Sequence, residues 1–226
     1  MRAHPRNEEK TGLARGVATA CWLASALLLA SGCAPARYRL AGDEAGGARE
    51  LFVSAAALSF PIEASFSGVA EISGRALPFV AGVNSRAPAE ETVGVYDPLG
   101  RPALFLENDG TRIRFSRGPA AGDFPPPNLQ PVPTGPVSLG RILSGAPGYP
   151  VDEGDLGRTA EGEWVLEDGR QRLFSDPSRR LLSRAEYDFS GKRVTVTYPG
   201  RETSGPPPLV KIEVSGAKIV LRRDTE

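Results

Sequence analysis

The chain has little of the chemistry that most enzymes use. It has one histidine, His4, and two cysteines, Cys21 and Cys33, among 226 residues. Beyond residue 33 no Ser–His or Cys–His pair can form, and neither a disulfide nor a zinc site built from His and Cys ligands is possible there. An enzyme would have to rely on carboxylates, lysine or tyrosine. A carboxylate-based envelope hydrolase is the enzyme alternative. We therefore expect a binding protein, not an enzyme, without a cofactor or a metal.

The chain also lacks an excess of either charge. Its 27 basic and 27 acidic side chains cancel. Without the first 32 residues, which hold four basic and two acidic groups, the net charge is −2. A nucleic-acid surface needs a basic stripe, so we expect no nucleic-acid partner. Three acids, Asp152, Glu153 and Asp155, lack the ligand spacing of an EF-hand, and a solvated loop explains them better.

The first 32 residues have the pattern of a secretory signal, with a basic start, a short apolar run and small residues at the end. The uncharged run 16–32 is too short for a spanning helix, which needs about 20 residues. Its end, Leu29-Ala30-Ser31-Gly32-Cys33, resembles a bacterial lipobox. That resemblance implies cleavage before Cys33 and acylation of its thiol. The alternative is an ordinary signal peptide that leaves Cys33 as a free thiol.

The remaining chain divides into a tether and one domain. Residues 34–47 are small and polar without a hydrophobic period, so we expect residues 33–47 to be the lipidated cysteine and a tether. Residues 48–226 form the expected domain. Apolar residues recur at helical spacing over 48–58, which predicts a short helix that ends at Pro61.

From Glu63 onward the hydrophobic period changes to two, which is typical of antiparallel strands with one covered face. Residues 108–110, 168–169 and 215–216 have hairpin-turn composition. The proline-rich stretch 118–136 cannot be a central strand, and Ser138–Ser144 is expected to be a short helix with Ser138 as its N-cap. Eleven strands are expected, at residues 63–73, 77–83, 93–95, 103–107, 111–116, 163–167, 170–175, 180–189, 192–198, 208–214 and 217–222.

This pattern predicts one α+β domain, an antiparallel sheet of about eleven strands with short helices on one side. Periodicity alone leaves a closed barrel and an open, curved half-barrel as alternatives. The apolar sheet face is either an ordinary core or the wall of a lipid cavity, since small residues at Ala64, Gly68, Ala70, Ala81 and Gly94 would leave volume for an alkyl chain. Its large members are Phe66, Ile72, Leu77, Phe79, Val95, Ile113, Phe115, Trp164, Tyr187 and Phe189.

Four segments, in order, resemble the outer-membrane lipoprotein receptor family LolB. Asp97-Pro98-Leu99-Gly100, between two expected strands, is similar to that family's Asn-Pro-Leu-Gly loop, with Asp97 in place of Asn. Residues 138–148 resemble its short helix and following turn, residues 186–198 its strand–turn–strand, and residues 207–221 its closing hairpin.

The resemblance implies an eleven-stranded half-barrel with helices over its concave side, and a cavity lined by the ten large residues named above. It implies that Pro98, Leu99 and Gly100 form a membrane-contacting loop; the alternative is an exposed turn without that role. The implied function is to accept the acyl chains of lipoproteins from a periplasmic carrier and insert them into the outer membrane. We expect a lipid-anchored monomer on the periplasmic face of that membrane. A scaffold lipoprotein on the same fold, or a relative that carries another lipid, are the alternatives.

Overall fold

The computed structural model describes residues 38–88, 90–123, 132–133, 137–151, 154–189, 191–203 and 205–224. The predicted signal peptide and Cys33 lie outside the described residues, as do Asp152, Glu153 and most of the proline-rich stretch. Within the described ranges no helix has the length and apolar character needed to cross a membrane.

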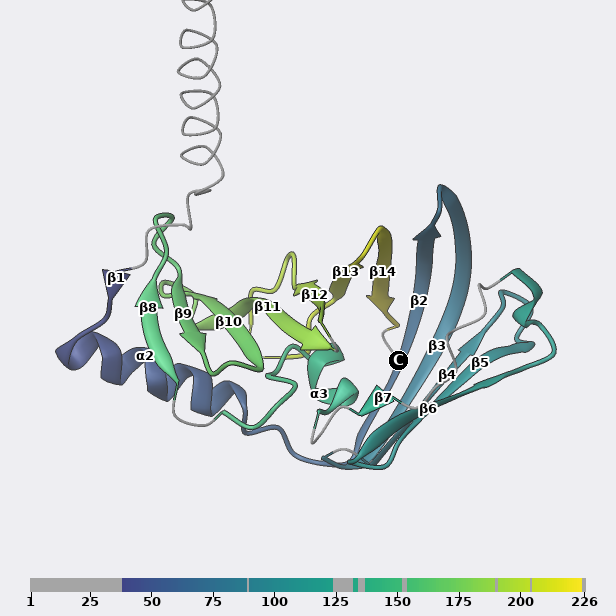
Figure 1. Ribbon diagram of the computed structural model, residues 1–226, viewed down its shortest axis with the longest axis horizontal. Coiled ribbons are helices and arrows are strands. Elements are labelled where there is room, and N and C mark those ends of the chain that lie inside the picture. Colours follow the sequence, from purple (N-terminus) through teal and green to yellow (C-terminus); the bar gives the residue numbers. More distant parts are fainter. Residues whose placement is uncertain are drawn as a thin grey trace, which may run out of the picture. The chain divides into compact units, whose positions relative to one another are not determined.

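Fourteen strands form one antiparallel sheet in the order β1-β8-β9-β10-β11-β12-β13-β14-β2-β3-β4-β5-β6-β7 (Figure 1). The edge strands β1 and β7 are paired on one side only among the described residues, so the sheet is open. The strands are β1 Tyr38–Arg39, β2 Ile62–Ile72, β3 Arg75–Ala87, β4 Glu90–Tyr96, β5 Pro102–Asn108, β6 Arg112–Arg117, β7 Val132–Pro133, β8 Asp155–Arg158, β9 Trp164–Glu167, β10 Gln171–Asp176, β11 Leu181–Phe189, β12 Lys192–Thr197, β13 Leu209–Val214 and β14 Ala217–Arg223.

The strand count differs from the eleven predicted. All eleven expected strands are present, and the additional ones are the short strands β1, β7 and β8. With two residues in β1 and β7 and four in β8, these segments are too short to show an alternating pattern. Asp155, expected in a solvated acidic loop, is the first residue of β8.

The first helix, α2 (Gly42–Ala55), begins six residues before the predicted start at Ala48 and ends before Leu58. The prediction was wrong because residues 42–47 carry no apolar period, whereas tertiary contacts hold this turn. The carboxylate of Glu44 accepts hydrogen bonds from the indole nitrogen of Trp164 at 3.1 Å and from Arg158. An acidic side chain in the first turn also interacts favourably with the helix dipole.

The second helix, α3 (Leu139–Leu143), lies where the sequence predicts it. The Ser138 side-chain oxygen accepts a hydrogen bond from the backbone N–H of Arg141 at 3.2 Å, which confirms the predicted N-cap. Gly145 follows the helix with a φ of +77°, a left-handed conformation that favours glycine. Among the described residues, the remaining helical segment is a single 3-10 turn, η1 (Ala121–Asp123).

Side chains alternate between two faces of the sheet. The inner face carries the hydrophobic core together with both helices: α2 contacts β8, β9 and β11, and α3 contacts β2 and β3. The outer face carries the intervening residues of each strand. Phe66 and Ala81, which are buried, represent the inner face, and their neighbours Ser67 and Val80, which are exposed, represent the outer face.

The sheet bends around α3. Glu91 of β4 accepts hydrogen bonds from the first turn of this helix, while the Tyr198 hydroxyl, directly after β12, donates to the Ile142 carbonyl at 2.9 Å. On a flat sheet five strand spacings would separate β4 from β12 by about 24 Å. The five-residue helix is only about 7.5 Å long. The inner face is therefore concave, as Figure 1 shows with strands on both sides of α3.

Candidate functional site

The ten residues predicted to line a lipid cavity all lie on the inner face. Nine of them belong to one hydrophobic cluster, and Leu77, opposite Ala70, is half-buried on the same face. They divide into two groups by burial. The buried members are Phe66, Phe79, Ile113 and Tyr187, and the half-buried members are Ile72, Leu77, Val95, Phe115, Trp164 and Phe189.

The part of the inner face beneath the helices is a packed core. Phe52 of α2 and Ile142 of α3 join the buried cluster there. Gly68 does not leave space for a ligand, because a Cβ at this position would stand 2.7 Å from the Phe79 ring. Gly94 was placed on the wrong face by the sequence analysis, since its strand neighbours Val93 and Val95 point inward and Gly94 therefore points outward.

The inner face of β4, β5 and β6 offers a half-buried apolar surface. Val93 pairs with Leu106, which pairs in turn with Phe115, and Val95 pairs with Leu104 on the same face. All five side chains are half-buried. We call these five residues the inner apolar surface. Their area retains contact with solvent, so an alkyl chain that covers it would gain dispersion contacts and remove apolar area from water.

A buried carboxylate joins this part of the sheet to α3. Glu91, 3% exposed, accepts hydrogen bonds from the backbone N–H groups of Leu139 at 2.7 Å and Gly140 at 2.9 Å. It also accepts from the Ser138 and Ser85 hydroxyls and from the Asn108 amide. One side chain thus satisfies donors from β3, β5 and the start of α3. Those from α3 are N–H groups of the first turn, which have no acceptor within the helix.

The other end of α3 is held by the strands on the far side of the bend. Besides the Tyr198 bond to Ile142, the Tyr187 hydroxyl accepts a hydrogen bond from the backbone N–H of Gly148 at 3.1 Å. Burial raises the pKa of both tyrosine hydroxyls, so both stay protonated at neutral pH. Arg141 donates from the helix to the carbonyl of Ala56, and burial lowers the pKa of its guanidinium. The helix is therefore fixed at both ends.

The turn between β4 and β5 presents Leu99 to solvent, with 80% of its surface exposed. Asp97 closes the turn: its carboxylate accepts hydrogen bonds from the backbone N–H groups of Leu99 at 3.0 Å and Arg101 at 2.9 Å. Gly100, at a φ of +77°, completes the reversal. The geometry holds Pro98, Leu99 and Gly100 outward, which is the arrangement a membrane-contacting loop requires.

The charge on Asp97 is stabilised by the turn that it closes. The backbone N–H of Arg101 has the largest effect, and the Arg101 guanidinium and the N–H of Leu99 add to it, so the pKa of Asp97 lies below its usual value. The Arg101 guanidinium also makes an ion pair with Asp97 at 2.6 Å. The only large apolar side chain of the turn therefore stands next to a neutralised pair of charges.

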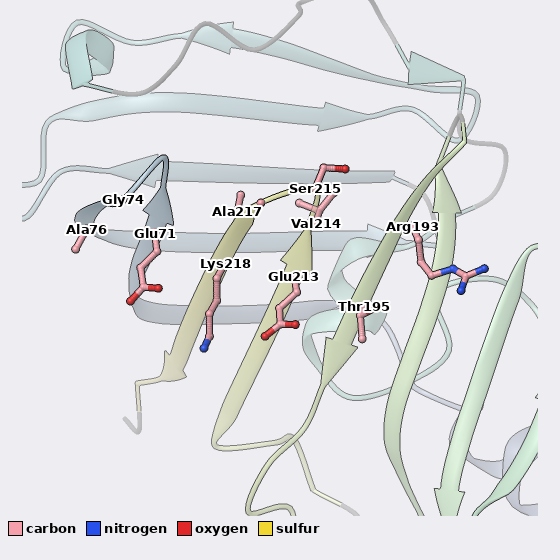
Figure 2. Close-up of a pocket in the computed structure, with 11 residues that line it drawn as sticks. Glu71, Gly74, Ala76, Arg193, Thr195, Glu213, Val214, Ser215, Ala217 and Lys218 are labelled. Atoms are coloured by element: carbon pink, nitrogen blue, oxygen red, sulfur yellow. The ribbon is translucent and has the colours of Figure 1, made fainter. Parts of the chain in front are cut away.

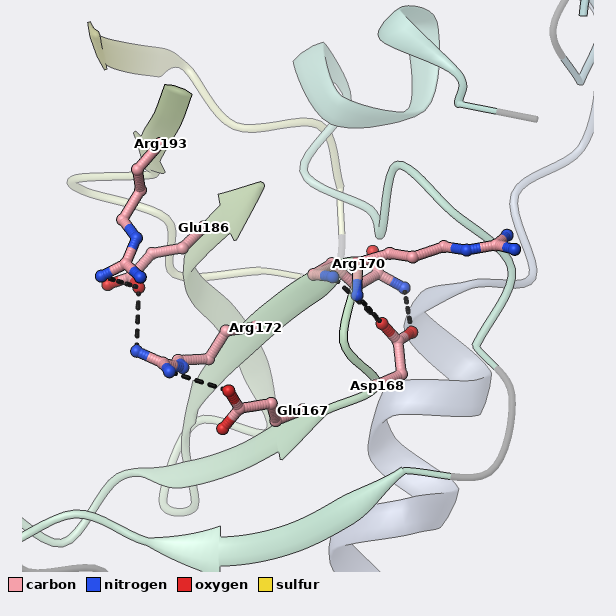
Figure 3. A network of polar contacts seen from close by, with 7 residues as sticks. Glu167, Asp168, Arg170, Arg172, Glu186 and Arg193 are labelled. Carbon is pink, nitrogen blue, oxygen red and sulfur yellow. Dashed lines mark hydrogen bonds and ion pairs between the residues drawn. The ribbon is translucent and has the colours of Figure 1, made fainter. Parts of the chain in front are cut away.

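The outer face differs between the two sides of the sheet. On β9–β12, Arg172 makes ion pairs with Glu167 at 2.8 Å and with Glu186 at 3.2 Å, and Arg193 approaches Glu186 at 3.9 Å (Figure 3). Arg184 extends this network to Glu163 at 3.6 Å. We call these side chains the ionic ladder. Their opposite charges pair across neighbouring strands, and such cross-strand pairs stabilise a sheet.

A polar groove of about 670 Å³ lies beyond the ladder, at the ends of β2 and β12–β14 (Figure 2). Glu71, Glu213 and Lys218 point into it, and the hairpin turns at Gly74 and Ser215 bound it. Within the described ranges no group of three or more Asp, Glu, His or Cys side chains gathers as metal ligands would. The groove is thus lined by charges of both signs.

Sequence reasoning missed Glu91, although a signal for it exists. Glu91 shares its alternation with Val93 and Val95, so an acidic residue falls at an inward-facing position. A carboxylate at such a position needs several buried donors, and Asn108 occupies the equivalent inward position on the next strand. The partners on α3 come from a distant segment, so alternation could have indicated the buried acid but not the helix that it binds.

Comparison with known proteins gives likenesses of structure only. No family model matches the chain, and no curated protein matches it in sequence. Among solved structures, it is similar to a LolA superfamily protein from Nitrosomonas europaea, with 16% identity over 79% of this chain and 91% of that chain and a TM-score of 0.45. It is also similar to a DUF1329 family protein from Desulfovibrio piger, with 11% identity over 80% of this chain and 91% of that chain and a TM-score of 0.44. Neither description names the outer-membrane receptor family that the sequence motifs resemble.

Proposed function

We propose that the protein is a lipid-anchored receptor that accepts the acyl chains of lipoproteins from a periplasmic carrier and inserts them into the outer membrane. The observation that carries the proposal is the inner apolar surface on β4–β6, which leads along the β4–β5 hairpin to the exposed Leu99. In this proposal Cys33 holds the protein at the periplasmic face of the membrane. The inner apolar surface receives the acyl chain, and the Leu99 turn meets the bilayer.

Such a transfer needs no covalent step. A buried CH₂ group is stabilised by about 0.8 kcal/mol relative to water, so an acyl chain moves from one apolar surface to another wherever the second holds it more tightly. A half-buried surface suits an intermediate acceptor, because it binds the chain less completely than a bilayer, which surrounds it. The mechanism is therefore a sequence of binding equilibria that ends in the membrane.

The first arm of the test measures acyl binding by the mature chain with a fluorescent fatty-acyl probe. V95Q places an amide on the inner apolar surface, and T92Q places the same amide on the outer face of the same strand. We expect V95Q to weaken binding about tenfold, because an acyl chain that covers the new amide removes water from it without offering a hydrogen bond. We expect T92Q to bind the probe as the parent does. Background binding by the parent chain, or equal binding by both variants, would contradict the proposal.

The second arm measures delivery of an acylated lipoprotein to liposomes. Leu99→Glu places an ionised carboxylate at the tip of the turn, where it resists leaving water. Since Leu99 is exposed, we expect thermal stability close to that of the parent, normal acyl-probe binding and loss of delivery. Normal delivery by this variant would leave Leu99 as an exposed turn residue without a membrane role.

A scaffold lipoprotein remains the second candidate, and one observation favours it. Phe66, Phe79, Ile113 and Tyr187 are buried in the core, and the Phe79 ring fills the space above Gly68. If the whole inner face is core, the parent chain will carry no lipid when it is extracted and analysed by mass spectrometry. Co-purified phospholipid without acylated protein would indicate a carrier of a different lipid.

A further inference from the structure

The outer face next to the Leu99 turn carries an apolar patch where a sheet exposed to water usually carries polar side chains. We call it the outer patch. It is formed by one residue each of β14, β4 and β5 and by residues of β2 and β3, namely Val220, Tyr96, Phe105, Val69, Pro78 and Val80.

The register of the strands makes the outer patch continuous. Val69 pairs with Val220 on one side and with Pro78 on the other, and Val80, two residues along β3, pairs with Tyr96. The Tyr96 and Phe105 rings meet edge to face, with centroids 6.1 Å apart. Apolar side chains therefore cover neighbouring positions on five adjacent strands.

Much of this apolar area is in contact with water. Val69 and Val80 are each 38% exposed and Phe105 is 37% exposed, although all three are large hydrophobic residues. Single exposed hydrophobic residues are ordinary, but a contiguous patch marks a surface that something else covers. Helix α3 cannot cover it, because that helix binds the opposite face of the sheet.

Two cations border the outer patch on the side of β13 and β14. Lys211 pairs in register with Val220, and Arg222 pairs with Ser67, the residue opposite Val80. Neither cation makes an ion pair within the part of the chain that the structure describes. Asp224, two residues after Arg222, accepts a hydrogen bond from the Ser67 hydroxyl at 2.8 Å. Glu71 and Glu213, in the cross-strand row next to Lys211, lie beside Lys218 in the polar groove. Two unpaired cations beside exposed apolar area are complementary to anionic lipid headgroups.

The outer patch is also continuous with the turn that holds Leu99. Tyr96, a member of the patch, is the last residue of β4, and Asp97 begins the turn. We propose that the outer patch is a second membrane-contacting surface, which lies on an anionic bilayer while Leu99 enters it. This inference rests on the proposed function, because it extends the membrane step of that function from one side chain to a face of the sheet. Contact over a face fixes the orientation of the inner apolar surface, which a single leucine cannot do.

The test places tryptophan at matched positions on the outer face and measures quenching by brominated phospholipid. V80W lies in the outer patch, and T195W lies on β12 beside the ionic ladder. Both are made in the complete acylated protein on phosphatidylethanolamine vesicles with or without phosphatidylglycerol. The parent protein gives the background emission, which comes from Trp164 because cleavage before Cys33 removes Trp22.

We expect brominated lipid to quench about half of the emission that V80W adds and little of that added by T195W, because interfacial contacts bury side chains at the headgroup–acyl boundary. We also expect the quenching of V80W to fall when phosphatidylglycerol is omitted or when Lys211→Gln and Arg222→Gln are introduced together. Equal quenching at both positions, no quenching of V80W, or quenching of V80W that is independent of phosphatidylglycerol would overturn the inference.

The acyl-probe assay separates this result from the proposed function. Unquenched V80W with normal acyl binding would overturn the membrane orientation alone and leave the receptor intact. Quenched V80W without acyl binding by the parent chain would overturn the receptor and support a membrane-bound scaffold.

Discussion

The strands β9–β12 and the strands β14, β2, β3, β4 and β5 belong to one sheet, yet their outer faces expose different kinds of side chain to water. On the first, Arg172 holds the carboxylates of Glu167 and Glu186, and the ionic ladder links neighbouring strands. On the second, Val69 and Val80 stand exposed at equivalent outward-facing positions. Alternation decides which face a residue occupies but not what that face is for.

The difference lies in the partners of the outer side chains, because both halves have the same antiparallel pattern of backbone hydrogen bonds. In the ladder half the charged side chains find their partners within the chain, so this surface is complete in water. In the patch half the apolar side chains have no covering element among the described residues, and the bordering cations Lys211 and Arg222 have no ion-pair partner there. The charges of the first half are paired within the described residues, and the second half is the surface that we propose to lie on the membrane.

The largest expected effect comes from breaking the link between the two halves at Glu91. E91A leaves the Ser138 hydroxyl and the N–H groups of Leu139 and Gly140 buried without their acceptor. Each such group costs about 1 to 3 kcal/mol, so we expect the free energy of unfolding to fall by about 3 kcal/mol or more. Urea denaturation measures the change, and E90A, at the exposed neighbouring position, should shift it by less than about 0.5 kcal/mol. Equal effects would show that Glu91 does not hold α3.

A smaller effect is expected from the ionic ladder. R172Q leaves Glu167 and Glu186 without their shared cation, and we expect a loss of about 1 kcal/mol, which decreases as salt is added because these charges are partly exposed. R193Q, which removes a longer and more exposed contact to Glu186, should have almost no effect. Thermal unfolding at low and high salt measures both. A salt-independent loss in R172Q would assign its contribution to packing of its aliphatic stem.

The smallest effect is local and concerns the Leu99 turn. Because the folded pKa of Asp97 is lowered, its ionised form stabilises the turn at every pH above the usual carboxyl pKa. That contribution is lost as the pH falls through the lowered pKa. As the pH is lowered from neutral, we expect the amide resonances of Leu99 and Arg101 to stay constant until strong acid and to shift only there. D97N keeps an oxygen acceptor for both N–H groups and should remove the shift, whereas a shift that persists in D97N would arise from another group.

The hairpins of this fold were predictable because each carries its own local signal. Asn108-Asp109-Gly110, Asp168-Gly169 and Ser215-Gly216 stand between alternating segments, and the structure places a turn at each. The capped helix α3 was predictable for the same reason, since Ser138 and Gly145 mark its ends within the segment itself. Local chemistry is sufficient where all of the partners are close in sequence.

Features whose partners are distant in sequence were not predictable. The start of α2 depends on Glu44 bonding to Trp164 on β9, and the strand β8 exists because it pairs with β1 and β9. The separation of the inner face into a packed core and a half-buried surface depends on where α2 and α3 lie. The outer patch was not predictable for a further reason. The sequence shows only ordinary strand residues at Val69, Pro78 and Val80, and the register alone places them beside Tyr96 and Val220.

The pairing of β2 with β14 governs how the sheet can be completed as the chain folds. Ile72 faces Ala217 and Phe66 faces Arg223, so a strand near the start of the domain is joined to the last strand in the sequence. In a chain that emerges N-terminus first, the edge of β2 that binds β14 stays unpaired until nearly all of the polypeptide has emerged. Non-local pairing of this kind is slow, and an unpaired apolar edge is prone to aggregation. The topology therefore requires that this edge of β2 be protected until β14 follows, and under the proposed function that interval includes export.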